Sequence, residues 1–323
     1  MHQTLRMFVL VLFTAALGQA AAQNWPAKPV RLVVPTASGT PPDLTARMVA
    51  EKLSVKLGQS FVVDNVLGGG GLIGAQAVAR AAPDGYTYYL GGIGIIVLDR
   101  HMYKSLPYDP DKDFAPVAVL YDSTTFGLAV HPELPARTVA ELIALAKSQP
   151  GKLSYGSDSV GVTQITGQWF NYRAGTDMVG VPYKSPAQLM PDVAAGRTQL
   201  VFTSLPALEP YRRSGKLRLL AVTNDKRFPT LPDVPAIAET VPGFKVIGMG
   251  LLFAPTGTPA DIGQRLNREI DPIVKEPEFV QKLLSFGFTT FGGAGSPQQI
   301  ADFIRAERAN WDTVLKGVKI EPQ

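Results

Sequence analysis

The stretch that decides the fold runs from Val30 to Leu90: VRLVVPTASGTPPDLTARMVAEKLSVKLGQSFVVDNVLGGGGLIGAQAVARAAPDGYTYYL. Short apolar runs at 30–35, 61–66 and 86–90 are typical of buried strands. Between them, residues 41–57 and 72–81 carry apolar side chains at near-helical spacing. This β-α-β-α-β order predicts a parallel sheet with helices on its faces.

The same alternation returns in the rest of the chain. Apolar runs predict further strands, and helical spacing predicts further helices between them. The last part of the chain is mainly helical. The expected strands are 126–131, 153–155, 179–182, 200–202 and 217–222, and the expected helices are 139–148, 162–174, 187–194, 260–274, 277–286 and 297–315.

Two long stretches without helical period, 114–126 and 246–254, separate these clusters. We interpret them as crossovers between two lobes. The first lobe then comprises residues 23–123 and 251–323, and the second comprises residues 124–250. The alternative is one continuous sheet of about ten strands, which approaches the practical limit of open sheets. We therefore predict an α/β protein with two lobes.

Composition narrows the functional classes. The 323 residues contain no cysteine, so disulfides, thiolate metal sites and a cysteine nucleophile are excluded. The formal net charge is +4, from 31 basic and 27 acidic residues, and these charges are scattered along the chain. This balance does not predict a surface for nucleic acid.

The first 22 residues have the three parts of a secretory signal peptide. Arg6 is followed by an apolar run over 7–18 and by Ala20-Ala21-Ala22. The alternative, a membrane anchor, is disfavoured because twelve residues span only about 18 Å as a helix, against a hydrocarbon core of roughly 30 Å. We expect an exported periplasmic protein that begins near Gln23. Export also argues against NAD, ATP and nucleic acid as partners.

The candidate chemistry lies in loops that follow strands, where open α/β sheets bind their ligands. The first such loop covers residues 35–43. Small residues let backbone amides approach a ligand, and a helix start offers unpaired N–H groups to an anion. Asp43, itself an anion, is expected to orient the loop, and a simple capped turn is the alternative. The candidate binding residues here are Thr36, Ala37, Ser38, Gly39, Thr40 and Asp43.

A glycine-rich loop follows the second expected strand. Gly69, Gly71 and Gly74 match the G-x-G-x-x-G pattern of dinucleotide-binding proteins. That pattern also requires an acidic residue at the end of the next strand. Here the strand ends with Tyr89-Leu90-Gly91, which contains no acidic residue. We therefore reject a dinucleotide and expect a lid or floor for a small ligand. Gly70, Gly71 and, after the third strand, Gly92 are the candidate close-approach positions.

In the second lobe, loop 157–164 combines hydroxyl side chains and glycine before a helix. An anion held between this loop and the first-lobe loops would be bound from both sides. Lys184 is the one obvious cation among the candidates, and a solvated surface lysine is the equal alternative. The candidate residues are Ser157, Ser159, Val160, Gly161, Thr163, Gln164, Tyr183, Lys184 and Ser204.

Catalytic motifs are weak. No G-x-S-x-G and no H-E-x-x-H occurs in the sequence, and we interpret His101 and His131 as structural or surface residues. Trp169, Phe170 and Tyr172 are expected in the core. No cofactor and no metal is predicted.

The sequence resembles the Bug family, the periplasmic solute-binding proteins of tripartite tricarboxylate transporters. The matching motifs span nearly the whole chain after residue 22. They include Trp25-Pro26-Ala27-Lys28-Pro29, Ala82-Pro83-Asp84-Gly85-Tyr86, Leu106-Pro107-Tyr108-Asp109-Pro110, Val181-Pro182-Tyr183-Lys184, Leu231-Pro232-Asp233-Val234-Pro235 and Ala254-Pro255-Thr256-Gly257-Thr258-Pro259.

The resemblance implies a Venus-flytrap of the type II periplasmic binding protein fold, which binds a carboxylate largely through backbone amides and ordered water. The chain departs from the family pattern in the candidate site. Thr40 stands where a second glycine is common, Gln164 stands where histidine is frequent, and Gly248 or Met249 replaces a tryptophan.

We thus expect a monomeric receptor that delivers a small organic acid to the permease subunits in the membrane. A sensory module for a sensor kinase is one alternative, and a secreted hydrolase or isomerase is a more remote one.

Overall fold

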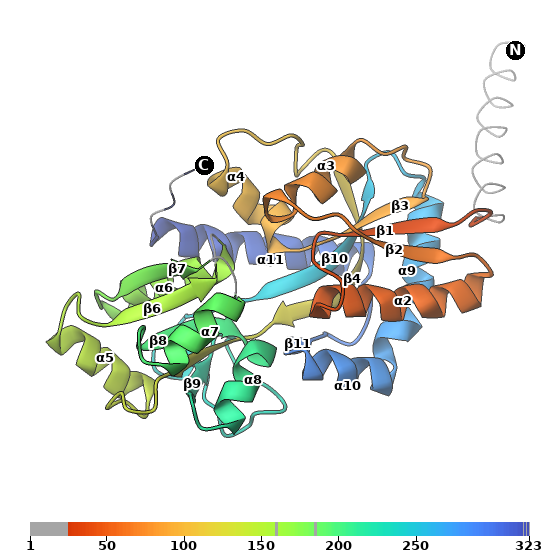
Figure 1. Ribbon diagram of the computed structural model, residues 1–323. Helices are drawn as coiled ribbons and strands as arrows, with labels where there is room; N and C mark the ends of the chain where they lie inside the picture. Colours follow the sequence, from red (N-terminus) through yellow and green to blue (C-terminus); the bar gives the residue numbers. More distant parts are fainter. Residues whose placement is uncertain (1–24, 159–160, 184–185, 319, 321, 323) are drawn as a thin grey trace, which may run out of the picture.

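The computed structural model describes residues 25–158, 161–183, 186–318, 320 and 322. Two separate mixed sheets, each covered by helices, form two lobes (Figure 1). We call the lobe of the six-stranded sheet the first lobe and that of the five-stranded sheet the second lobe. The predicted two-lobed α/β architecture is confirmed, and the alternative of one continuous sheet is wrong.

The first lobe is built on the sheet β11-β4-β10-β3-β1-β2. Strand β1 runs parallel to β2 and β3, whereas β10 is antiparallel to β3 and β4. Helices α2 and α3 connect the three parallel strands, as the apolar pattern predicts. The strands are β1 (Val30–Val34), β2 (Phe61–Asn65), β3 (Thr87–Gly91), β4 (Phe114–Thr124), β10 (Gly248–Pro255) and β11 (Phe288–Thr289), and the helices are α2 (Pro41–Leu57), α3 (Leu72–Ala79), α4 (Asp99–Met102), α9 (Ala260–Lys275), α10 (Pro277–Ser285) and α11 (Pro297–Lys316).

The second lobe is built on the sheet β7-β6-β8-β5-β9. Strand β6 runs parallel to β7 and β8, and β5 is antiparallel to β8 and β9. The strands are β5 (Phe126–Val130), β6 (Ser154–Asp158), β7 (Val179–Tyr183), β8 (Leu200–Ser204) and β9 (Arg218–Val222), and the helices are α5 (Val139–Ser148), α6 (Val162–Ala174), α7 (Pro186–Ala194) and α8 (Leu205–Arg213).

The two stretches interpreted as crossovers are the long strands β4 and β10, which pair with each other in the first sheet. The chain enters the second lobe after β4 and returns at β10. The domain boundaries, after residues 123 and 250, stay a proposal, and the second of them falls inside β10.

Several short elements have no counterpart among the expected ones. Residues Gly94–Leu98 form a π-helical turn that leads into α4. Helix α8 has Pro206 in its first turn, where proline is tolerated, and Pro210 in its interior. Both elements depend on packing, which local pattern does not encode.

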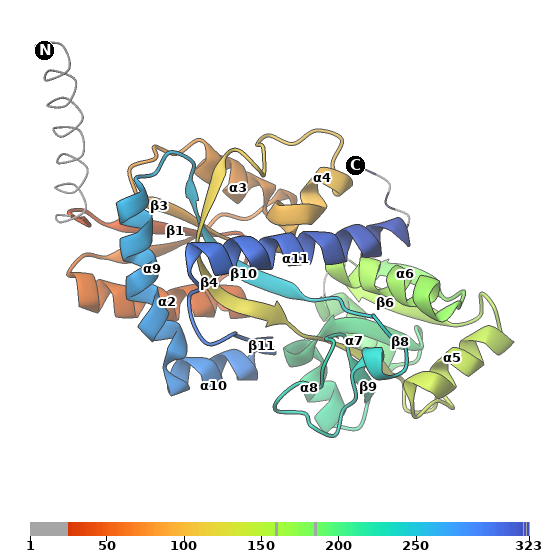
Figure 2. The same cartoon turned by 180° about the vertical axis from the view of Figure 1, so that it is seen from behind.

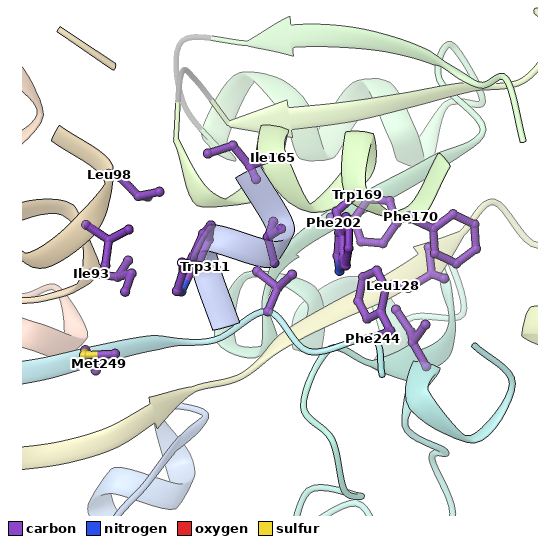
Figure 3. Close-up of a cluster of buried hydrophobic side chains, with 14 of the residues drawn as sticks. Ile93, Leu98, Leu128, Ile165, Trp169, Phe170, Phe202, Phe244, Met249 and Trp311 are labelled. Carbon is purple, nitrogen blue, oxygen red and sulfur yellow. The ribbon is translucent and has the colours of Figure 1, made fainter. Parts of the chain in front are cut away.

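Helix α11 links the lobes. It runs along the first lobe and ends beside α6 of the second (Figure 2). The same helix contributes Trp311 and Val314 to one buried apolar cluster that contains residues of both lobes. Figure 3 shows Trp311 and Ile165 between Ile93, Leu98 and Met249 on one side and Trp169, Phe170, Leu128, Phe202 and Phe244 on the other.

Trp169 and Phe170 are buried, as expected for core residues. The same prediction is wrong for Tyr172, which is 61% exposed and stacks on Trp169 at a ring separation of 5.5 Å. Stacking leaves the outer face of the tyrosine in solvent.

The expected signal peptide, residues 1–22, lies outside the described residues. Within the part of the chain that the structure describes, no helix combines the length and apolar character needed to cross a bilayer.

Candidate ligand-binding site

The sheet topology gathers the predicted loops at two strand edges. Strands β1, β2 and β3 are parallel neighbours, so the loops that follow them share one edge of the first sheet. Strands β6, β7 and β8 place their carboxyl ends together in the same way in the second sheet. Parallel pairing therefore brings the candidate residues of each lobe to one edge.

Asp43 organises the first loop. Its carboxylate is fully buried and accepts hydrogen bonds from the Gly39 amide (2.8 Å), the Arg47 Nε (2.9 Å) and the Asn65 Nδ2 (2.8 Å). Asn65 also donates to the Thr36 carbonyl at 2.9 Å. These bonds tie both ends of the loop to β2, and they are the bonds of a residue that orients the loop.

Burial alone would raise the pKa of Asp43. The hydrogen bonds from Arg47, Asn65 and Gly39, together with the positive charge of Arg47, outweigh that effect and lower the pKa. The carboxylate is therefore ionised at neutral pH. Arg47 is engaged by this anion, so its charge is largely neutralised before any ligand arrives.

The start of α2 has fewer free N–H groups for binding an anion than the sequence suggests. The first two helical positions are Pro41 and Pro42, which have no N–H group. The Thr40 hydroxyl donates to the Ala37 carbonyl at 2.7 Å and lies 2.9 Å from the Thr36 hydroxyl, so it serves the loop itself. Ala37 and Ser38 are exposed residues. Among the described residues, no acceptor binds their backbone amides.

The glycine-rich loop lies against the first loop. Gly68, Gly69, Gly70 and Gly71 all have positive φ, which favours glycine. The Tyr89 hydroxyl donates to the Gly71 carbonyl at 3.2 Å, and the Tyr103 hydroxyl donates to the Gly69 carbonyl at 3.1 Å. A Cβ atom at Gly71 would lie 3.0 Å from the Tyr89 oxygen and 3.3 Å from Pro35. The two loops are therefore packed together.

Gly92 has a packing role. A Cβ atom there would collide with the Met249 carbonyl of β10. This glycine lets the end of β3 approach β10, next to the glycine-rich loop. The close approach at Gly92 is therefore to the backbone of β10. A close approach of a ligand at this glycine stays a prediction.

Asp99 carries a half-buried carboxyl group. Burial raises the pKa of Asp99, and the hydrogen bond that it accepts from the Tyr108 hydroxyl offsets part of this rise. Sequence reasoning missed Asp99 and also Asn65, the residue that joins the first loop to β2. A polar residue at the carboxyl end of a strand was the available signal for Asn65.

The second-lobe candidates have mixed surroundings. Ser157 is buried at the end of β6, and Thr163 is buried in the first turn of α6. Gly161 precedes α6 in extended backbone, and Ser204 precedes α8. The Tyr183 hydroxyl donates to Asp192 of α7 at 3.0 Å, so it supports the lobe. Ser159, Val160 and Lys184 lie outside the described residues.

Gln164 and Ser157 share a pocket of about 270 Å³ between α6 and β7. The described residues contain no cluster of three or more His, Asp or Glu side chains that could hold a metal ion.

The chain is similar to several solved structures. R. palustris Rpa4515 with adipate is 38% identical, with a TM-score of 0.81 over 93% of this chain and 100% of that one. The periplasmic binding protein BugD is 29% identical, with a TM-score of 0.76 over 93% of this chain and all of BugD. MatC from Rhodopseudomonas palustris with bound malate is 29% identical, with a TM-score of 0.75 over 90% of this chain and all of MatC.

Sequence relatives agree. A UPF0065 protein of Bordetella bronchiseptica is 36% identical over 97% of this chain and 92% of its own length. BugT of Bordetella pertussis is 31% identical over 99% of this chain and its own full length. The family model for the tripartite tricarboxylate transporter family receptor, TctC, matches residues 45–320. The chain therefore belongs to this family of solute-binding transporter receptors, which are binding proteins and not enzymes.

Proposed function

We propose that this receptor captures a small organic carboxylate between its lobes in the periplasm and delivers it to the membrane subunits of a tripartite tricarboxylate-type transporter. The observation that carries the proposal is the first loop. Ala37 and Ser38 are exposed, and their amides bind no acceptor among the described residues, on a loop that Asp43 holds in place. Amide N–H groups held in this way bind anions without a charged side chain.

The solved relatives support the same ligand class. The structures of Rpa4515 and MatC contain adipate and malate, which are both dicarboxylates. The predicted leader at residues 1–22 and the periplasmic relatives support export. We expect the receptor to act as a monomer without a cofactor.

Delivery requires a change of shape. A ligand that contacts both lobes stabilises the closed form by its differential affinity for closed over open. The candidate residues Thr36, Ala37, Ser38, Gly39 and Thr40 would close on the second-lobe candidates at the ends of β6, β7 and β8. The membrane subunits of the transporter then recognise the closed form.

The test is a thermal-shift screen of the purified receptor with dicarboxylic, tricarboxylic, amino and aromatic acids. A ligand at about 100 times its Kd is expected to add about 2.7 kcal/mol to the unfolding free energy. Ser38→Trp should abolish this gain, because the indole would fill the loop. Ser148→Trp, at an exposed position of helix α5, is the matched control and should keep it.

Stabilisation by sugars or cations and by no acid would overturn the proposed ligand class. Equal gains in Ser38→Trp and Ser148→Trp would move the binding site away from the first loop.

A further inference from the structure

Two large apolar side chains at the glycine-rich loop are exposed to solvent. Leu67 is 53% exposed and Ile73 is 52% exposed. Single exposed apolar residues are common on protein surfaces, whereas a group of them often marks a binding surface. The other large apolar residues that are exposed in the described part of the chain occur singly, on separate segments: Val55, Val62, Tyr172, Val179 and Phe291.

Gly68 brings the two side chains together. A Cβ atom at Gly68 would lie 2.5 Å from the Ile73 Cδ1 atom, so the isoleucine side chain lies over this glycine, which directly follows Leu67 in the chain. No charged residue occurs between positions 66 and 79. We call Leu67, Gly68 and Ile73 the apolar patch.

The apolar patch begins beside the first loop. Strand β2 runs parallel to β1 with Val34 opposite Asn65, and the Val66 amide donates to the Val34 carbonyl at 3.0 Å. Leu67 is the next residue, at the level where β1 has passed into the first loop. Two residues before Leu67, the Asn65 side chain donates to the Thr36 carbonyl at 2.9 Å. The patch and the exposed part of the first loop therefore lie at the same edge of the lobe.

The glycine-rich loop is also fixed at its other end. A Cβ atom at Gly71 would lie 3.3 Å from Pro35, and the Gly71 carbonyl accepts a hydrogen bond from the Tyr89 hydroxyl. The position of the patch relative to the first loop is thus set by contacts on both sides of it. The side of the first lobe that carries the start of α2 faces the second lobe (Figure 1).

Open amides next to an apolar patch match a solute that has an anionic end and a hydrocarbon chain. The amides of Ala37 and Ser38 would bind the carboxylate, and methylene groups that extend from it would cover Leu67 and Ile73. Covering apolar surface removes it from water, which favours binding. A short acid would leave the patch in solvent, and a hydroxylated chain would place a polar group against it.

We propose that Leu67 and Ile73 determine the specificity of this receptor by contacting the hydrocarbon chain of the bound acid, so that acids with a longer unsubstituted chain bind more tightly than short ones. The inference deepens the proposed function and rests on it, because the first loop must hold the carboxylate.

The test is isothermal titration calorimetry of the purified receptor with malonate, succinate, glutarate, adipate and pimelate. From the shortest acid that binds to the tightest, the affinity is expected to rise about two- to fourfold per methylene group, where fourfold corresponds to complete burial. In Leu67→Ser/Ile73→Ser the rise should fall below about 1.5-fold per methylene group, because the apolar contact is lost. Val55→Ser, at an exposed position of α2, is the control and should keep the wild-type rise.

Two further measurements separate specificity from a structural role. The affinity of Leu67→Ser/Ile73→Ser for the shortest acid that binds should stay within about twofold of the wild-type value, because the first loop is unchanged. Its melting temperature without ligand should also stay close to that of the wild type, because both side chains are exposed. Loss of all binding in this variant would mean that the patch supports the first loop, and it would overturn the inference.

The remaining outcomes separate the two proposals. If the shortest acid that binds is also the tightest, or if the variant keeps the wild-type rise per methylene group, the apolar contact is overturned and the carboxylate receptor stands. Binding of no acid by the wild type, in this series or in the wider screen, overturns the proposed function, and the inference falls with it.

Discussion

At the scale of single residues, the candidate site depends on a carboxylate that is not available to the solute. Asp43 has no exposed surface, and its oxygens are occupied by Gly39, Arg47 and Asn65. An anion is thereby used to position the amides that would hold another anion. Hydrogen bonds to a charged group contribute about 1.5–3 kcal/mol each, more than a surface ion pair.

Asp43→Asn is expected to lower the unfolding free energy at pH 7 by about 2 kcal/mol, as measured by urea denaturation. Asp64→Asn, which breaks only the exposed pair with Arg31, should cost less than about 1 kcal/mol. The folded-state pKa of Asp43 is lowered, so its contribution is present above the unfolded-state pKa of about 3.9 and is lost as the pH falls through the folded value.

The difference between wild type and Asp43→Asn should therefore shrink on acidification below about pH 4. A difference that stays constant to the acid limit would mean that the charge of Asp43 does not stabilise the loop.

At the scale of elements, α11 holds the two lobes together. Its Trp311 has no exposed surface, and a Cβ atom at Gly317 would lie 2.5 Å from the Trp169 ring of α6. Glu307 on the same helix is buried and binds Lys245, in the segment before β10, at 2.5 Å. One helix thus contributes both apolar packing and an ion pair to the junction of the lobes.

Glu307→Gln is expected to destabilise the protein by about 3 kcal/mol, because it leaves Lys245 without its counter-charge in a largely buried place. Asp312→Asn, at an exposed position of α11, should change the stability by no more than about 0.5 kcal/mol. Both are measured by urea denaturation. Equal effects would mean that the pair adds nothing to the junction.

At the scale of the whole molecule, two sheets are joined by β4, β10 and α11. In the proposed function, closure on a ligand is a rotation of the lobes about this junction, through which one buried apolar cluster runs. A compact chain of about 300 residues has a radius of gyration of about 19 Å.

Small-angle scattering is therefore expected to show a smaller radius of gyration, close to about 19 Å, when a stabilising acid is added. Ser38→Trp should show no such change with the same acid. A ligand that raises the melting temperature without changing the radius of gyration would contradict closure of the lobes.

Much of the fold follows from local sequence. The strands β1–β3 and helices α2 and α3 lie where apolar periodicity places them, and β4 and β10 are the extended crossovers that separate two lobes. Periodicity is a property of neighbours in sequence, so it survives without knowledge of the tertiary structure. The family motifs extend over the same elements.

The site was less accessible to sequence reasoning. Small residues after strands identify loops that can approach a ligand, and the ligand roles of those residues stay predictions. The sequence does not show that the hydroxyls of Thr40 and Tyr183 are used within the protein, or that Asn65 secures the first loop. Each of these bonds depends on which donor and acceptor the folded chain brings together.

By itself, the sequence determined the alternating elements, the two clusters of strands and the family. Each of these depends on the spacing of neighbouring residues or on short motifs. Only the tertiary structure decided which polar groups are satisfied and which stay open. The bridging position of α11 and the open amides of Ala37 and Ser38 emerge when segments far apart in the chain pack together, since hydrogen bonding and burial are properties of that packing.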